Sequence, residues 1–183
     1  MVEAILTNEM KALLSKMKDK KIVSYECEKD DGFSRTFGNI RINLDTFSIE
    51  ITNEEHTLPF FEGEEDVTYF ECKEVNPQEA FVPYVVTETA VKEVNQIITG
   101  IELINDTINV NDGEYEISFD EAIIIHMDTD ILMLARDTWF SEIISIRDND
   151  NYNQIFPVDE VKEEWSNEGE KSVSIERNRI TIC

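Results

Sequence analysis

Basic residues are scarce in this 183-residue chain, and they are scarcest in its middle. The chain holds 40 Asp and Glu against 16 Lys and Arg, so its formal net charge at pH 7 is -24. Between Ile42 and Asp130, 22 acidic residues accompany only two basic ones, Lys73 and Lys92. This acidic middle repels phosphate groups, which excludes nucleic acid as a direct partner and disfavours anionic membranes. It favours cationic partners: metal ions, basic peptides or the basic face of a nucleic-acid-binding protein.

Cysteine and glycine are also scarce and irregularly spaced. The three cysteines, Cys27, Cys72 and Cys183, form no Cys-x-x-Cys pair, which argues against a zinc site. Their odd number argues against a disulfide framework and for a reducing compartment. Carboxylates beside Cys27 and Cys72 would raise the pKa of either thiol, so we expect buried strand residues rather than nucleophiles. The six glycines are scattered and form no glycine-rich phosphate loop.

Long apolar runs are missing as well. No stretch approaches the roughly 20 apolar residues that a membrane-spanning helix needs. The first residues, MVEAILTNEM, lack the basic region and the apolar run of a secretory signal. Together with the reduced cysteines, these features predict a cytoplasmic protein.

Histidine, the commonest general base, is limited to His56 and His126. A general base must lie within hydrogen-bond reach of a nucleophile or substrate, and neither histidine occurs in an HExxH or HxE pattern. We expect His56 on the surface and His126 in a structural role. The sequence therefore predicts no catalytic residues, no cofactor and no enzyme.

One segment resembles a calcium loop. It begins Asp148-Asn149-Asp150-Asn151, and Asp159 falls at the twelfth position. The loop lacks the expected glycine, and no helix is predicted before it. A solvated turn is the main prediction and a cation site at residues 148–159 the alternative, so no metal ligands are assigned.

Apolar residues, in contrast, are sufficient for a folded core, at 41% of the chain. A helical stripe with Thr7 or Asn8 as cap predicts a helix at about residues 8–19. Alternating patterns then predict five strands, at residues 22–27, 36–44, 47–52, 58–61 and 67–75.

A second series follows a predicted linker at residues 76–86. There Thr87 caps a predicted second helix, with Val91, Val94, Ile97 and Ile98 on one face and Gly100 at its end. Further strands are predicted at residues 101–104, 108–110, 114–119, 122–127, 131–135 and 139–147, with a hairpin turn at residues 111–113. In the C-terminal part, the sequence pattern predicts a helix at residues 158–165 and a hairpin of residues 171–176 and 179–183.

The two series resemble each other, since residues 42–51 align with 109–118 and residues 67–71 with 138–142. We therefore predict an α+β fold of two similar helix-plus-antiparallel-meander units, a possible internal duplication, with a C-terminal helix and hairpin. The predicted domains are residues 1–76, residues 87–150, and a C-terminal part, residues 151–183, that packs on the second unit. The alternative is that any two helix-then-meander segments look alike.

Many acids of the acidic middle alternate with apolar residues along predicted strands. Carboxylates two residues apart on one face of a strand lie about 6.8 Å apart, a spacing of the same order as that of nucleic-acid phosphates. A sheet surface carrying them would attract a groove lined with Lys and Arg. The predicted partner-binding residues are Glu50, Glu54, Glu55, Glu62, Glu64, Glu65, Asp66, Glu114, Glu116 and Asp120.

Solubility is the competing explanation for this charge, because acidic surfaces keep β proteins from pairing edge to edge. Solubility alone, however, needs a net charge of only about 2 to 8 for a small domain. In size, acidity and lack of catalytic groups, the chain resembles two kinds of inhibitor: anti-CRISPR and other anti-defence DNA mimics, and immunity proteins against nuclease toxins.

This resemblance implies a non-enzymatic inhibitor that binds the basic nucleic-acid-binding surface of a partner protein, which we expect to be a nucleic-acid-binding enzyme. Two alternatives stay open from the sequence. One is a metal-binding or enzymatic module that uses clustered carboxylates, and the other is a structural assembly protein built through its apolar strands.

Overall fold

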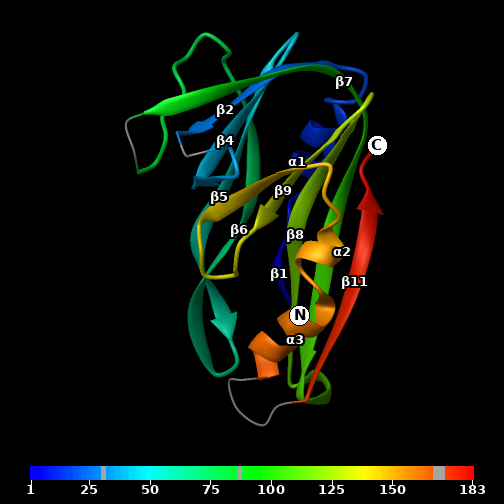
Figure 1. Cartoon of the computed structure of the whole chain (residues 1–183). Helices are drawn as coiled ribbons and strands as arrows, with labels where there is room; N and C mark the ends of the chain where they lie inside the picture. The colour runs from blue at the N-terminus through cyan, green and yellow to red at the C-terminus, as the bar shows by residue number, and fades with distance from the viewer. Residues whose placement is uncertain (30–31, 86–87, 167–171) are drawn as a thin grey trace.

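The computed structural model describes residues 1–29, 32–85, 88–166 and 172–183, and the fold is mostly β (Figure 1). Strands account for 59% of the chain and helices for 13%. In chain order the described elements are β1 (Val2–Ala4), α1 (Asn8–Ser15), β2 (Lys21–Glu28), β3 (Arg35–Phe37), β4 (Asn39–Leu44), β5 (Ser48–Phe60), β6 (Gly63–Val75), β7 (Thr89–Val110), the short 3-10 helix η1 (Asn111–Gly113), β8 (Tyr115–Met127), β9 (Ile131–Arg136), β10 (Ile143–Asp148), α2 (Tyr152–Ile155), α3 (Val158–Ser166) and β11 (Val173–Thr181).

All described strands belong to one large sheet, so the predicted α+β fold with duplicated units is wrong. The order is β3-β10-β9-β8-β7-β2-β4-β5-β6, with β11 antiparallel to β7 and the short β1 parallel to β8. Strand β2 of the first supposed unit pairs with β7 of the second. The three predicted domains stay a prediction.

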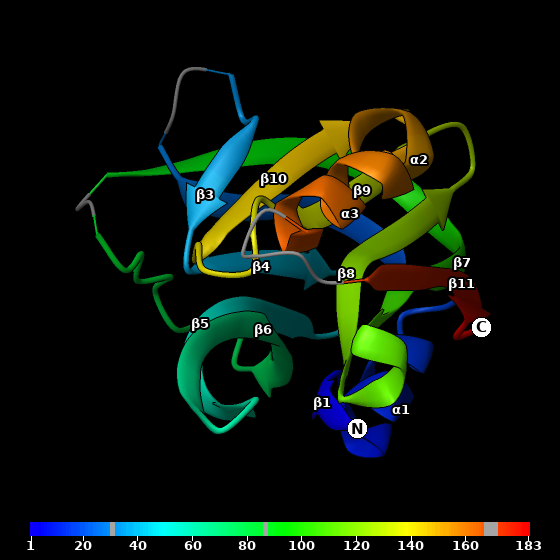
Figure 2. The same cartoon turned by 90° about the horizontal axis from the view of Figure 1, so that it is seen from below.

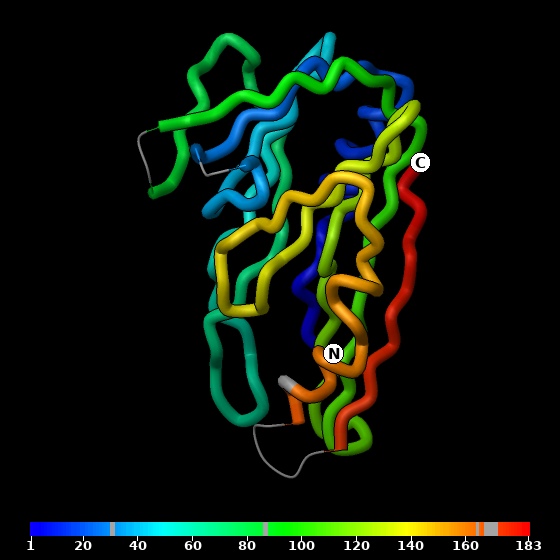
Figure 3. The backbone as a smooth tube through the Cα atoms, viewed as in Figure 1, coloured from blue at the N-terminus to red at the C-terminus, as the bar shows by residue number. Residues whose placement is uncertain are grey.

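Strand β7 replaces the predicted second helix, and its 22 residues tie the sheet together. Its first part, residues 89–97, pairs with β2, and its second part, residues 98–110, pairs with β8 (Figures 1 and 3). Asn95 has a φ of 60° close to the register shift of the β2 ladder, which fits a bulge that bends the strand. The segment is rich in Thr, Val and Ile, whose branched side chains favour strands, and this preference overrides the helical spacing. Thr87, the predicted cap, lies outside the described residues.

Several local predictions are confirmed. Helix α1 occurs where the apolar stripe predicted it, and the Thr7 side chain accepts a hydrogen bond from the Met10 N–H at 3.2 Å. The turn at residues 111–113 joins β7 to β8. Helix α3 falls in the predicted C-terminal position. Cys27 and Cys72 are buried strand residues, and burial together with Glu71 raises the pKa of the Cys72 thiol to about 12.

Two predictions for the second half are wrong. Residues 139–142 form a loop before β10 rather than the start of a strand. The expected C-terminal hairpin is a single strand, β11, which passes through residues 177–178 without a turn because it pairs along β7 from Thr181 to Val173. Lys171, the expected start of that hairpin, lies outside the described residues.

The sheet curves round so that its two halves enclose the core, as the view from below shows (Figure 2). Strands β3 and β4 follow each other through Gly38, yet β3 pairs with β10 and β4 pairs with β2 and β5. Ile42 and Ile51 of one half and Ile125 and Leu134 of the other belong to the same buried cluster. Leu14 of α1 packs in that cluster as well.

Candidate interaction surface

The outer part of the β5–β6 hairpin, at one end of the molecule, carries half of the ten predicted acids (Figure 1). Strand β4 pairs with β5 only as far as Thr52, so the rest of the hairpin continues as a two-stranded ribbon. Its outer part carries five exposed acids, which we call the acidic hairpin end: Glu55, Glu62, Glu64, Glu65 and Asp66. The Asp66 carboxylate accepts a hydrogen bond from the Thr57 hydroxyl at 2.6 Å.

An aromatic cluster holds this hairpin end against the rest of the fold. The Phe60 ring lies 5.2 Å from that of Tyr115 and 5.5 Å from that of Trp139, measured between centroids. Phe61 stacks on Tyr115 at 4.6 Å, and the Tyr115 hydroxyl donates to the Pro59 carbonyl at 3.0 Å. The ribbon is therefore a fixed surface, because its apolar side chains are packed while the acids point to solvent.

Two further predicted acids, at the start of β8, flank the Tyr115 that contacts the hairpin. Tyr115 lies between Glu114, which is exposed, and Glu116, which is half-buried. Asn111 donates its amide to Glu114 at 2.6 Å, and Asn109 donates to Glu116 at 3.3 Å. Seven of the ten predicted acids thus gather at one end of the molecule, where the hairpin tip and the β7–β8 turn both lie (Figures 1 and 2).

The other three predicted acids have partners within the fold. Glu50 is buried and pairs with Arg41 at 3.3 Å and with Lys73 at 3.1 Å. Glu54 accepts a hydrogen bond from the Tyr84 hydroxyl. A single strand pattern could not reveal these partners, because they come from other strands and from the segment before β7.

Asp120 is fully buried rather than displayed. Its two oxygens accept from the Leu6 N–H at 2.8 Å and from the Asn105 amide at 3.0 Å. The segment that follows β1 covers this side of β8, which the alternating pattern around Asp120 did not predict. Burial raises the pKa of the Asp120 carboxyl, although these hydrogen bonds and the charges of Lys11 and Arg136 oppose the shift.

This raised pKa predicts a pH dependence of stability. Between the ordinary value of an Asp, about 3.9, and its raised native value, Asp120 binds a proton more tightly folded than unfolded. The stability that Asp120 contributes therefore falls as pH rises through that window. We expect the free energy of unfolding of the natural chain to fall relative to Asp120→Asn, by up to about 1.4 kcal/mol per pH unit. Urea unfolding of both proteins from pH 4 to 7 measures the difference, and a difference that is flat or increases with pH contradicts the assignment.

Besides Arg41 and Lys73, which pair with Glu50, several other basic residues in the described part of the chain pair with acids. Ion pairs join Lys29 to Glu88, Lys92 to Asp148, Arg136 to Glu121, Arg177 to Asp106 and Arg179 to Glu102. By contrast, Lys11, Lys16, Lys18, Lys20 and Lys21 lie on or close after α1. The start of β2 lies at the end of the molecule away from the hairpin tip (Figure 1). The charge is thus unevenly spread, with the acidic hairpin end at one pole.

The histidines have local structural contacts. His126 lies 2.9 Å from a carboxylate oxygen of Glu102, and the half-buried His56 ring stacks on Tyr69 at 4.1 Å. Where the calcium-like sequence occurs, Asn151 caps α2 and Asp148 pairs with Lys92. Among the residues that the structure describes, no group of three or more His, Cys, Asp or Glu side chains is arranged to hold a metal ion.

No helix in the described ranges is long and apolar enough to span a bilayer. Comparisons of the chain with protein-family models, with curated proteins and with solved structures gave no match.

Proposed function

We propose that this chain is a non-enzymatic inhibitor that binds the basic nucleic-acid-binding surface of a partner protein. The observation that carries the proposal is the acidic hairpin end, five exposed carboxylates on a ribbon packed against the fold. Glu114 and Glu116 lie beside Tyr115 at the same end of the molecule. A partner groove that neutralises phosphates with Lys and Arg would meet a comparable row of negative charges here.

The spacing of the carboxylates supports this proposal. Glu64 and Asp66 are two residues apart on one strand, so their side chains lie on the same face about 6.8 Å apart. Thr57 and Pro59 lie opposite them, so the acids of this face meet no lysine or arginine across the strand pair. Because the ribbon is already ordered by its aromatic contacts, binding would cost less conformational entropy than ordering a disordered acidic tail.

Two kinds of partner have the required chemistry. One is an enzyme of a host defence system that grips DNA or RNA, and the other is a toxic nuclease that this chain would neutralise as an immunity protein. Both are basic proteins that handle nucleic acid in the cytoplasm, where we also place this chain. The shared expectation is competition, in which the acidic surface occupies the groove that the nucleic acid would otherwise fill.

Affinity capture on the immobilised full chain tests the proposal. Basic nucleic-acid-binding proteins should be retained at about 0.1 M NaCl and released at about 0.5 M, where screening shortens the reach of exposed charges. Duplex DNA or structured RNA added at low salt should release the same proteins by competition. Retention that survives 0.5 M NaCl, or that nucleic acid leaves unchanged, would overturn the proposal.

A further inference from the structure

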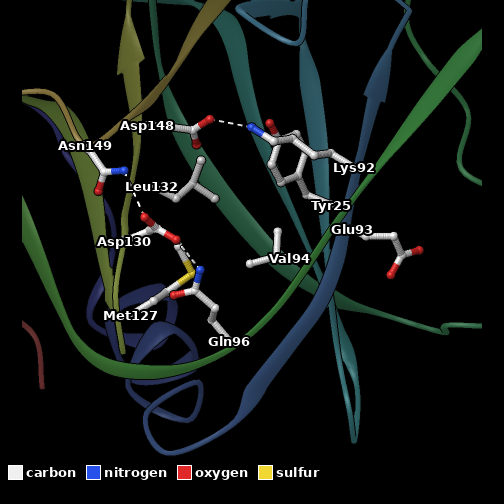
Figure 4. Close-up of a pocket in the computed structure, with 10 residues that line it drawn as sticks. All are labelled: Tyr25, Lys92, Glu93, Val94, Gln96, Met127, Asp130, Leu132, Asp148 and Asn149. Atoms are coloured by element: carbon white, nitrogen blue, oxygen red, sulfur yellow. Dashed lines mark hydrogen bonds and ion pairs between the residues drawn. The ribbon is translucent and has the colours of Figure 1, made fainter.

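A cavity of about 200 Å³ lies apart from the acidic hairpin end, between β2, the first half of β7, the β8–β9 turn and the end of β10 (Figure 4). Val94, Met127 and Leu132 supply its apolar lining. Sites for drug-sized ligands usually measure about 300–1,000 Å³. This cavity therefore suits a small ion or a single side chain rather than a large metabolite.

Tyr25 gives the cavity an unusual polar group. The residue is 1% exposed and its ring packs in the main core cluster. Its hydroxyl end points toward the Lys92–Asp148 ion pair (Figure 4), and within the described part of the chain this buried hydroxyl has no hydrogen-bond partner. Buried polar groups are nearly always hydrogen-bonded, so an unpartnered hydroxyl at a cavity indicates a position for a ligand.

The charged groups at the cavity favour a cation. Asp148 pairs with Lys92, whose ammonium lies 5.6 Å from the centroid of the Tyr25 ring. Asp130 is fixed by donors that include Gln96 and, at 3.0 Å, the Asn149 amide. These hydrogen bonds lower the pKa of the Asp130 carboxyl, which keeps it ionised. Two carboxylates and one ammonium therefore line the cavity, which leaves an excess of negative charge. The Lys92 ammonium already makes the contacts that a bound cation would make.

We propose that this cavity binds a small organic cation of the guanidinium class, with its flat head against the Tyr25 ring and its N–H groups donating to Asp148 and to the Tyr25 hydroxyl. A guanidinium is weakly hydrated and stacks on aromatic faces. It therefore gives up less hydration free energy than an ammonium ion when it enters such a site. Asp130 adds a second negative charge, and an alkyl stem would contact Val94 and Leu132. The Lys92 side chain, which is 35% exposed, swings out to solvent when the guest enters.

Titration of the ¹⁵N-labelled full chain tests this site without any partner protein. The probes are butylguanidinium for a free guanidinium compound, N-acetyl-arginine-N-methylamide for an arginine side chain, and butylammonium for comparison. Sodium chloride is adjusted to keep the ionic strength constant. We expect saturable shifts of the Lys92, Val94 and Leu132 amides with both guanidinium probes. The tighter of these two probes identifies the source of the guanidinium, and tighter binding of butylammonium overturns the guanidinium assignment.

Four variants distinguish a built site from general attraction to a negative protein. Asp148→Asn should weaken binding about tenfold through loss of a charge-assisted hydrogen bond, and Tyr25→Phe should weaken it by a smaller factor. Lys92→Met should tighten binding because it removes the competing ammonium. Glu93→Gln is the charge-matched control, since Figure 4 shows the Glu93 carboxylate turned away from the other side chains, and it should leave affinity within about twofold.

The proposal is overturned if the shifts do not saturate, or if Glu93→Gln weakens binding as much as Asp148→Asn. It is also overturned if Lys92→Met binds no tighter than the natural chain. Amide spectra of each variant confirm that it is folded. Because the titration contains no basic partner, its result is independent of the inhibitor function proposed for the acidic hairpin end.

Discussion

Arg136→Met is expected to lower the free energy of unfolding by about 3–5 kcal/mol, the usual cost of breaking a buried ion pair from one side. Arg136 is 2% exposed, and its guanidinium donates to Glu121 at 2.8 and 3.2 Å and to the Thr68 carbonyl. It also stacks over the Phe119 ring at 4.4 Å. The variant leaves the Glu121 carboxylate and the Thr68 carbonyl without this donor, although methionine fills part of the space. Urea unfolding followed by circular dichroism measures the change.

The matched control removes both charges. In Arg136→Met combined with Glu121→Leu, no buried carboxylate is left unpaired, so we expect the double variant to recover much of the lost stability. The loss of stability that remains in the double variant then measures the cost of leaving the Thr68 carbonyl without its Arg136 donor. Equal destabilisation of the single and double variants would mean that packing around Arg136, and not its charge, supports this part of the sheet.

Reversing the charge of the acidic hairpin end is expected to have the largest effect on partner binding. Glu62, Glu64 and Glu65 are all exposed, so their replacement by Lys changes the local charge by six without disturbing the aromatic cluster. If the hairpin end steers a basic partner, the association rate measured by surface plasmon resonance at low salt should fall by roughly 10- to 1,000-fold. The difference between the two proteins should shrink as salt rises.

The control variant carries the same net charge at another place. Glu9, Glu74 and Glu79 are also exposed, and their replacement by Lys gives the same total charge on α1, at the far end of β6 and after β6. We expect its association rate to stay within a few-fold of the natural value, as is usual for charges outside an interface. Similar losses in both variants would indicate that total charge matters and that the hairpin end is not the binding surface.

Local features could be predicted from the sequence where one or a few neighbouring residues set the backbone conformation. Thr7 caps α1 as its side chain suggests, and the turn after β7 uses left-handed Asn111, Asp112 and Gly113. The spacing of Val91, Val94, Ile97 and Ile98 fits a helix and, with a bulge, also a bent strand. Pairing with β2, about 70 residues earlier, selects the strand, and no local pattern contains that information.

The candidate surface could be predicted only where exposure depends on neighbouring residues, and not where it depends on distant segments. The run Glu62 to Asp66 is exposed because it begins in the turn of the β5–β6 hairpin, and the sequence analysis predicted its acids as partner-binding residues. Asp120 has a similar alternating pattern, yet the Leu6 N–H binds it from a segment 114 residues away. The cavity beside Tyr25 was missed because its residues come from β2, β7, the β8–β9 turn and the end of β10, which only the folded sheet brings together.

The long bent strand β7 also has a consequence for how the chain is made. Strands β2, β4, β5 and β6 are complete by Val75, but one edge of β2 pairs with residues 89–97 and stays open until they are synthesised. At elongation rates of about 5–20 residues per second, that open edge is available to other nascent chains for a second or more. Ten of the 22 acidic residues between Ile42 and Asp130 precede Val75, so they are already in the chain during this interval. Repulsion between neighbouring chains on one polysome would then protect the unfinished sheet from edge-to-edge pairing.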